Sequence, residues 1–526
     1  MGVGPLFVKP TRQPRNLSCF GRLFKRLLAR RLTSPRGRRY SSGMAIHHTA
    51  VFKKKGFWAA AAALCAVLIV AFLFEKNDYA SQLSIAAGYQ AKILCSAVFV
   101  SKRDPKTVLR EDIAIHPLMR FIRSRIDRDK KDVVSSTLGL FKARAVYLDK
   151  LGAVLLSGVP EDAVRSWPVR IPDPWPEDPA SVAWPTGDLA NPEELPAGIE
   201  RPRIEEALDR VFAESDPALV EDDDRPGAEG LGRIVAERYA PSYFRDMPLI
   251  GWSMSKTVTA ALAGLRVGEG KLSLKDPVSV PEWKRRGDRR GAITLEQLLW
   301  MSDGLEFDEE YETKPVSDVN RMLFTMPDMA AFAAGLPLVA EPGSAFHYSS
   351  GTTNIISRLI RQSFASQEDY FAFPRRSLFN KIGMRSALIE PDASGTFSSA
   401  SYVYASARDW ARFGLLLLNG GVWEGRRVLP DGWVEFMTTP SPASGRGDYG
   451  AQTWLNRGPA GRPDERPYPT LPPDMFKLHG YQDQITVVIP SRHLVLVRLG
   501  MTTKGDFPLE AFVADILKAI PNSSPG

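Results

Sequence analysis

The sequence predicts an α+β fold in which an antiparallel sheet is flanked by helices. Two apolar runs near the C-terminus, Gln484 to Ile489 and Leu494 to Leu499, have the pattern of neighbouring strands joined through Pro490. A third run, Gly232 to Tyr239, has an apolar centre between polar ends and is also expected to be a strand. Helical patterns fill the chain between them, so the two ends of this region are expected to meet in one sheet.

The expected helices follow from apolar periodicity and from end signals. Thr294 and Gln297 have the spacing of a capping box before an apolar run, and Ser406 and Asp409 form a second candidate box. Asn419 and the two glycines after it would end the helix that this second box begins. The expected helices are Ile204 to Ser215, Thr257 to Val267, Ile293 to Trp300, Trp410 to Leu418 and Pro508 to Ile520.

Charge is distributed unevenly along the 526 residues, whose formal net charge is +8. Residues 1–55 hold fourteen Lys and Arg and no Asp or Glu, which leaves a net charge of −6 for the rest of the chain. The basic character therefore belongs to an N-terminal tail, and the sequence does not support nucleic-acid binding by the main domain.

Cysteine and histidine are scarce where a metal site would need them. The three cysteines lie in the first hundred residues, and the chain has six histidines and no H-E-x-x-H motif. We therefore expect no disulfide framework in the body of the protein, no metal site and no organic cofactor.

An uncharged apolar run, Phe57 to Phe74, follows three lysines and is long enough to cross a bilayer as a helix. We expect residues 56–75 to be a transmembrane signal-anchor and residues 1–55 a basic cytoplasmic tail, because the basic side of such an anchor stays in the cytoplasm. The catalytic domain would then lie outside the inner membrane. Cleavage at Ser84-Ile85-Ala86 is the competing interpretation.

The first forty-three residues allow three interpretations. Their arginine-rich, acid-free composition is typical of a mitochondrial targeting sequence. They could also be a genuine tail, or an overextended gene start, since Met44 would open an ordinary signal-anchor. We favour the overextended start.

Two regions are expected between the anchor and the main domain. Residues 77–157 would be a membrane-proximal region, in which 138–148 and 153–157 form a hairpin; a stalk is favoured over a dimerisation or substrate-guiding flap. Residues 158–202 hold many prolines, interleaved with Trp167, Trp175 and Trp184, and would be an extended linker packed along a surface. The main domain would then cover 203–522.

Ser253 and Lys256 stand three residues apart at the opening of an apolar helix, Gly251-Trp252-Ser253-Met254-Ser255-Lys256. This spacing puts the hydroxyl and the amine on one helical face. Serine needs a base to become a nucleophile, and a lysine can be that base if burial lowers its pKa. The alternative is an ordinary helix start with a solvated lysine.

Tyr348 lies on a short polar loop after a Pro-Gly turn, and Ser350 follows two residues later. A tyrosine can relay a proton if a nearby ammonium lowers its pKa, and Ser350 would point the same way and bond the lysine or the substrate. A core aromatic with a satisfied hydroxyl is the alternative for Tyr348.

The third motif leads into the strand at Gln484. Gly480 permits close approach of the backbone, so this strand edge could offer an N–H group to an oxyanion. Lys477 or His479 could supply positive charge there, although His479 could also be an ordinary surface histidine.

In this order the three motifs resemble the serine β-lactamase and penicillin-binding-protein superfamily. The resemblance is strongest to its class C-like branch, which includes esterases and 6-aminohexanoate-dimer hydrolase. The segments GWSMSK, ITLEQLL, EPGSAFHYSSGTTN, YASARDWARFG and VIPSRHLVLVRLG extend it over roughly residues 200–520. It implies a β-lactamase/transpeptidase-like fold with an inserted helical subdomain.

The resemblance also implies roles. Ser253 would be acylated, Lys256 would activate it, Tyr348 would carry protons, and the N–H groups of Ser253 and Tyr481 would form the oxyanion hole. The branch often has Asn at the position of Ser350, although Ser also occurs.

Two further positions depart from the family. Leu478 stands where penicillin-recognising enzymes carry the Lys of Lys-Thr-Gly, a cation that meets a substrate carboxylate, unless Lys477 or His479 substitutes. Asp483 stands where a small glycine is usual, and would narrow the pocket or repel anions.

The sequence thus predicts a membrane-anchored serine hydrolase that cleaves a small ester or amide through an acyl-serine. A cell-wall D-Ala-D-Ala carboxypeptidase or a β-lactamase is the alternative enzyme, and a catalytically idle scaffolding protein of the same fold is the alternative of another class. The sequence does not indicate the physiological substrate or the oligomeric state.

Overall fold

The computed structural model describes residues 78–114, 119, 121–137, 139–190, 198–212, 216–221, 232–502 and 507–520. Contacts divide the chain into Met1–Leu73 and Phe74–Gly526, and the described residues all lie in the second unit. The apolar run Phe57 to Phe74 falls outside them. None of the helices within the described ranges combines the length and the apolarity needed to cross a membrane.

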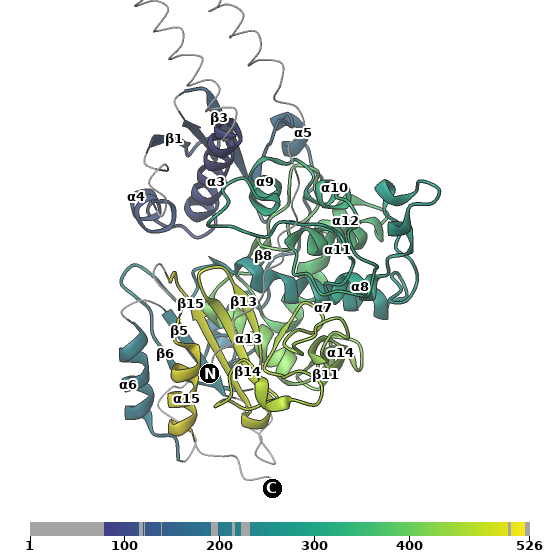
Figure 1. Cartoon of the computed structure of the whole chain (residues 1–526). Helices are drawn as coiled ribbons and strands as arrows, with labels where there is room; N and C mark the ends of the chain where they lie inside the picture. Colours follow the sequence, from purple (N-terminus) through teal and green to yellow (C-terminus); the bar gives the residue numbers. More distant parts are fainter. Residues whose placement is uncertain are drawn as a thin grey trace, which may run out of the picture. The chain divides into compact units, whose positions relative to one another are not determined.

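Runs of consecutive strands and runs of consecutive helices follow one another along the described chain (Figure 1). The helices are α3 (Tyr79–Phe99), α4 (Pro105–Val108), α5 (Glu161–Arg165), α6 (Arg201–Phe212), α7 (Ser255–Gly268), α8 (Leu295–Leu299), α9 (Asp318–Thr325), α10 (Met329–Ala334), α11 (Ser350–Gln362), α12 (Gln367–Ser377), α13 (Ala407–Leu418), α14 (Trp433–Thr438) and α15 (Leu509–Ala519). The strands are β1 (Ile122–Asp127), β2 (Asp132–Thr137), β3 (Phe141–Leu148), β4 (Gly152–Leu155), β5 (Asp216–Glu221), β6 (Arg233–Glu237), β7 (Leu249–Ile250), β8 (Leu388–Ile389), β9 (Val403–Ala405), β10 (Val422–Trp423), β11 (Arg426–Arg427), β12 (Trp454–Leu455), β13 (Phe476–Gly480), β14 (Gln484–Ile489) and β15 (Leu494–Leu499).

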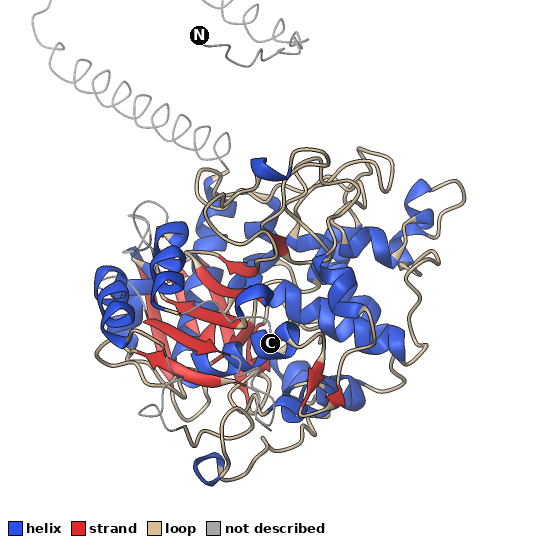
Figure 2. Ribbon diagram, turned by 90° about the horizontal axis from the view of Figure 1, so that it is seen from below, coloured by secondary structure: helices blue, strands red, loops and turns tan. Residues whose placement is uncertain are grey.

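The main sheet is antiparallel and has the order β12-β13-β14-β15-β5-β6, which joins strands from both ends of the main domain. This confirms the expected α+β class. Helices α6 and α15 pack together on one face, with the core residues Ile204, Leu208 and Phe512. Helix α13 covers the other face, where the larger core lies. Figure 2 shows the strands between helices on both sides.

A smaller sheet, β7-β9-β8, carries the chain into the motif around Ser253. Helices α8 to α12 are inserted in the chain between β7 and β9. The expected capping box at Thr294 and Gln297 is complete. At α13 half of the box is present: Ser406 accepts a hydrogen bond from the Asp409 N–H at 3.3 Å, but the Asp409 carboxylate accepts from Ser386 instead.

Residues 79–155, which we call the N-terminal module, form helix α3 and the antiparallel sheet β1-β2-β3-β4. The expected hairpin is present as β3 and β4, whose register pairs Tyr147 with Ala153. Helix α3 packs on β2, β3 and β4 and also contacts α9 of the main domain. The module is therefore attached to the main domain through α3.

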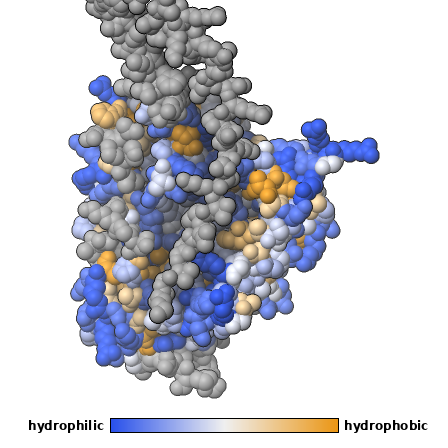
Figure 3. Space-filling model, in the orientation of Figure 1, coloured by the Kyte–Doolittle hydropathy of each residue, from blue (hydrophilic) through white to orange (hydrophobic). Residues whose placement is uncertain are grey.

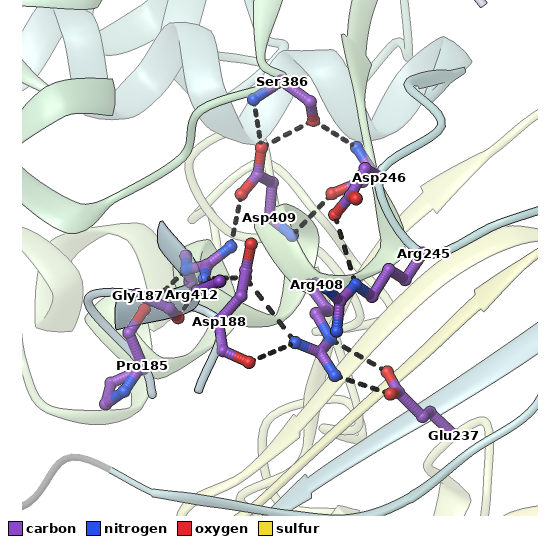
Figure 4. Close-up of polar contacts among 12 residues, drawn as sticks. Pro185, Gly187, Asp188, Glu237, Arg245, Asp246, Ser386, Arg408, Asp409 and Arg412 are labelled. Carbon is purple, nitrogen blue, oxygen red and sulfur yellow. Dashed lines mark hydrogen bonds and ion pairs between the residues drawn. The ribbon is translucent and has the colours of Figure 1, made fainter. Parts of the chain in front are cut away.

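The part of the proline-rich segment around Pro185 and Asp188 is held on the main domain through α13, as Figure 4 shows. Arg412 donates to the Pro185 carbonyl at 2.6 Å and to the Asp188 carboxylate at 2.6 Å. Arg408 donates to Glu237 of β6 at 2.6 Å, and both guanidinium groups lie over the Trp184 ring. Trp184 is buried at this contact, with an exposed fraction of 9%.

Large hydrophobic side chains that reach the surface are scattered. In the view of Figure 3, hydrophilic residues cover most of the coloured surface and hydrophobic ones form separate small patches. Among the residues that the structure describes, the exposed large hydrophobic ones are Tyr79, Phe121, Leu140, Trp175, Leu189, Phe244 and Val339. Single exposed side chains of this kind are common and indicate no binding surface by themselves.

Candidate active site

Ser253 lies in a tight turn between β7 and α7. Gly251 donates its N–H to the Val403 carbonyl of β9 at 2.9 Å, and residues 252–254 form a 3₁₀ turn that leads into α7. Trp252 has a φ of 47°, a conformation that costs energy for a non-glycine residue and that concentrates at functional sites. A Cβ atom on Gly251 would lie 2.3 Å from Trp410, so the turn requires glycine there.

Lys256 is buried beside the serine. Its Nζ donates to Ser253 Oγ at 2.9 Å, to Ser350 Oγ at 2.9 Å and to the Ala400 carbonyl at 3.2 Å. Burial lowers the pKa of Lys256 to about 8, while the charge of Glu309 acts in the opposite direction. Neutral lysine, the form that can accept the serine proton, is thus accessible near neutral pH.

Tyr348 lies against Lys256 on the loop before α11. The Lys256 ammonium lies 4.8 Å from the centre of the tyrosine ring, and the ring packs on Tyr449 and Trp454. Burial and the Glu309 charge raise the pKa of Tyr348 far above its usual value, although a hydrogen bond with Ser253 lowers it. The expectation of a depressed tyrosine pKa was wrong for this state: the ammonium faces the ring, and the phenol stays neutral.

Ser350 begins α11 and is fully buried. It accepts the hydrogen bond from Lys256 and donates from Oγ to the Glu309 carboxylate at 2.5 Å. Ser350 was expected to bond either the lysine or the substrate, and in the structure it bonds Lys256.

Glu309 is the acidic residue of this site, and sequence reasoning missed it. Its carboxylate accepts from the Ser350 N–H at 2.7 Å and from the Tyr311 hydroxyl at 2.6 Å. The Ser350 hydroxyl therefore bridges Glu309 and Lys256, because it donates a hydrogen bond to the carboxylate and accepts one from the amine. Glu309 comes from the acid-rich run EFDEEYE, in which no spacing distinguishes one acid from another.

The end of β13 lies directly against the serine turn. A Cβ atom on Gly480 would be 2.1 Å from the Gly251 carbonyl oxygen, so only glycine allows this approach. Tyr481 follows; its ring meets the Trp252 ring edge-on at 5.7 Å and stacks on Tyr311 at 5.5 Å. The peptide after Gly480 is therefore held beside Ser253, and its part in an oxyanion hole stays a prediction.

His479 and Lys477 face away from Ser253. Side chains alternate along β13, and both of these line a separate cleft of about 1290 Å³ with Phe507 of the α6/α15 side. His479 bonds Asp483 at 3.0 Å, and burial lowers the His479 pKa, opposed by Asp483. The expectation that either residue supplies positive charge to the active site is corrected by this placement.

The structure also shows where the side chains of Leu478 and Asp483 lie. Leu478 is fully buried in the larger core, on the strand face that carries Gly480. Asp483 has a φ of 60° in the turn after β13, bonds His479 and accepts from the Phe507 N–H at 3.1 Å. Burial raises the pKa of Asp483, but its hydrogen bonds lower it to about 2. The carboxylate is thus engaged behind the strand and does not narrow the site at Ser253.

The site offers oxygen and nitrogen groups for proton transfer rather than a metal cage. Across the described part of the chain, no group of three or more His, Cys, Asp or Glu side chains is arranged to hold a metal ion. A buried lysine that contacts a serine hydroxyl, with a neutral tyrosine beside both, is suited to nucleophilic catalysis.

The Beta-lactamase family model matches residues 231–518, more than half of the chain. The chain therefore belongs to the β-lactamase family, within the serine β-lactamase and penicillin-binding-protein superfamily.

Its similarity to individual proteins is distant. It is 27% identical over 215 residues to the 6-aminohexanoate-dimer hydrolase of Paenarthrobacter ureafaciens, covering 38% of this chain and 53% of that protein. It is also 27% identical over 253 residues to Protein Rv1367c of Mycobacterium tuberculosis, covering 39% and 63%. The chain thus spans less than two thirds of the length of these relatives.

The chain is also similar to two solved structures, both at low identity. A penicillin-binding protein homolog from Caulobacter crescentus has a TM-score of 0.46 at 16% identity, covering 61% of this chain and 98% of that one. A family VIII carboxylesterase has a TM-score of 0.44 at 17% identity, covering 61% and 96%.

The contact between Glu309 and Ser350 predicts a pH effect. Activity that needs neutral Lys256 rises as the pH passes the pKa of this lysine. Because the Glu309 charge raises that pKa, Glu309→Gln should move the rising limb of the profile of kcat/KM for a neutral ester to lower pH. A full profile of wild type and variant measures this shift. An unchanged limb would show that Glu309 does not act on the catalytic base.

Proposed function

We propose that this protein is a serine hydrolase that cleaves an ester or amide bond of a small molecule through an acyl-serine intermediate at Ser253. The observation that carries the proposal is the position of the buried Lys256 Nζ, 2.9 Å from Ser253 Oγ. Membership of a family of serine hydrolases supports it. One relative is named a 6-aminohexanoate-dimer hydrolase, and one of the similar solved structures is named a family VIII carboxylesterase.

Acylation follows from these contacts. Neutral Lys256 takes the proton of Ser253 while Oγ forms a bond to the substrate carbonyl carbon. The N–H groups of Ser253 and Tyr481 stabilise the oxyanion. When the carbon–oxygen or carbon–nitrogen bond breaks, Tyr348 gives its phenol proton to the leaving group and regains one from Lys256.

Deacylation uses the same groups in reverse. A water molecule loses a proton to the Tyr348 and Lys256 pair as its oxygen attacks the acyl carbon. The bond to Ser253 Oγ then breaks, the serine regains a proton, and the acid product leaves.

Neutral substrates fit this site better than carboxylates. Leu478 stands where a cation would meet a carboxylate, and Lys477 and His479 lie on the other face of β13. Glu309 adds negative charge beside Ser350, and Glu312 lies within 3.4 Å of the Tyr481 hydroxyl. This charge pattern favours ester or unusual amide substrates over a cell-wall peptide or a β-lactam.

We predict that kcat/KM for a neutral p-nitrophenyl ester exceeds that for the same ester with a carboxylate on its acyl group by about tenfold, or about 1.4 kcal/mol. In Glu309→Gln the ratio of the two kcat/KM values should be smaller, because the substitution removes one negative charge that repels the carboxylated ester. A penicillin-type reporter serves as a third substrate. If it were hydrolysed as fast as the neutral ester, the β-lactamase interpretation would be favoured.

The proposal extends to location. The run Phe57 to Phe74 and the lysines before it support a single-pass anchor in the inner membrane, with the N-terminus in the cytoplasm and the catalytic domain outside. Full-length protein should then stay with membranes in alkaline carbonate and be digested by protease added to spheroplasts. Release by carbonate would contradict the anchor.

A fluorophosphonate probe tests the hydrolase proposal, because it reacts with activated serine hydroxyls whatever the substrate. Wild type should be labelled and Ser253→Ala should not. Ser255→Ala is the matched control, since Ser255 instead accepts the Val403 N–H at 3.0 Å. Absence of labelling in wild type would favour the catalytically idle alternative.

A further inference from the structure

A buried ion pair joins the N-terminal module to the catalytic region. Lys92 of α3 and Glu390, which follows β8, are 1% and 0% exposed, and their charged atoms lie 2.5 Å apart. Lys92 belongs to a helix outside the part of the chain that the family shares, residues 231–518. The pair therefore connects a feature particular to this chain with the shared catalytic fold.

The Glu390 carboxylate is fully occupied by the module. Besides Lys92, it accepts from the Ser96 hydroxyl at 2.9 Å and from the Ala153 N–H at 2.6 Å. Gly152 lies so close that a Cβ atom there would be 2.6 Å from Glu390. A buried carboxylate without these donors would be strongly unfavourable, so the module and Glu390 depend on each other.

The backbone of Glu390 holds the segment that reaches Lys256. Its N–H donates to the Tyr402 carbonyl at 3.0 Å, and its carbonyl accepts from the Ser398 N–H at 2.9 Å. Between these two contacts lies Ala400, whose carbonyl accepts the Lys256 ammonium at 3.2 Å. We call residues 390–402 the lysine-facing loop.

A second set of contacts runs from the same pair toward the serine. The Lys92 ammonium lies 4.4 Å from the centre of the Tyr402 ring, and that ring is 6.2 Å from the Trp252 ring. Trp252 immediately precedes Ser253. Lys256 thus contacts the lysine-facing loop at Ala400, and Ser253 follows a tryptophan that lies near Tyr402 of the same loop.

We propose that the N-terminal module is a working part of the hydrolase, and that Lys92 and Glu390 are positioning residues that hold the lysine-facing loop so that Ala400 fixes the Lys256 amine beside Ser253. The inference rests on the proposed function, because it assumes that Lys256 activates Ser253.

The test compares two neutralised ion pairs in the full-length chain. In Lys92→Met/Glu390→Gln, the new amide can use the contacts to Ala153 and Ser96 while the charges disappear. In the control Arg103→Met/Asp112→Asn, a pair of the same module that does not contact the lysine-facing loop is neutralised; its side chains are 9% and 12% exposed. Thermal unfolding followed by circular dichroism gives the unfolding midpoint of each variant. The labelling rates are then compared at a temperature below the midpoints of both variants, so that only folded proteins are compared.

The readout is the second-order rate of fluorophosphonate labelling as a function of pH. We expect Lys92→Met/Glu390→Gln to react at least about tenfold more slowly, since small displacements of catalytic groups have large effects on rate. The pH of half-maximal reaction should fall, because a displaced Ala400 carbonyl no longer stabilises the ammonium. Glu309 and Tyr348, which also face Lys256, are unchanged in every variant.

The control pair should react within about twofold of wild type and at the same pH midpoint. Ser96→Ala, which removes one donor to Glu390, should give an intermediate rate, and it decides the question if the double variant does not fold. Wild-type rate and pH midpoint in the Lys92 and Glu390 variant, or in Ser96→Ala in that case, would overturn the inference while leaving the proposed function intact. Equal slowing by both pairs would also overturn it, and an unlabelled wild type would overturn the proposed function itself.

Discussion

Replacing Lys256 by methionine should lower kcat/KM for a neutral ester by about a thousandfold or more. The variant keeps a side chain of similar length but cannot take the proton of Ser253, and a positioned general base contributes about 10²–10⁴-fold to rate. Steady-state kinetics measure the loss. Because burying an amine with no carboxylate in direct contact is costly, the variant should unfold at the same temperature as wild type or higher.

Lys477→Met is the matched control for this experiment. Lys477 is also buried, its pKa is likewise lowered to about 8 by burial, and its amine bonds the Tyr468 hydroxyl at 2.6 Å. Lys477 lies on the face of β13 that points away from Ser253. Similar losses in both variants, or a fully active Lys256→Met, would remove Lys256 from the role of base.

Tyr348→Phe should lower kcat by about a hundredfold and leave KM within about threefold. The phenol is proposed to carry protons to the leaving group and from water, whereas the ring still packs on Trp454. Tyr449→Phe is the control, since Tyr449 is buried and contacts the Tyr348 ring edge-on at 5.9 Å. A variant of Tyr348 that kept wild-type turnover would remove this residue from proton transfer.

The main sheet could be predicted where its strands are apolar, as in β14 and β15. The strand β5 lies in the same sheet but was not predicted, because its sequence DPALVE combines acids with a proline. In the N-terminal module, β1 has the sequence IRSRID with mostly exposed or half-exposed side chains, so no apolar run marks it. A strand with one side facing solvent has alternating polar and apolar residues, and this pattern predicts a strand less clearly than the continuous apolar run of a strand buried on both sides.

The grouping of Ser253, Lys256, Tyr348 and Ser350 could be predicted from three short motifs in order. The orientation of His479 was available in the same sequence: Gly480 and Leu478 share one face of a strand, so His479 must lie on the other. Glu309 could not be found in this way, because its position depends on how a long loop folds back onto α11. Likewise, nothing in the spacing of Lys92 and Glu390 indicates that residues 298 positions apart form a buried pair.

The most direct test of the account is to trap the acyl-enzyme. Wild type and Tyr348→Phe are mixed with a p-nitrophenyl ester, quenched with acid within milliseconds, digested and analysed by mass spectrometry. The account predicts that the acyl group is attached to Ser253 in wild type and in Tyr348→Phe, and that it is absent from Ser253→Ala. Ester turnover without an acyl group on Ser253, or with the same adduct on another residue of Ser253→Ala, would contradict it.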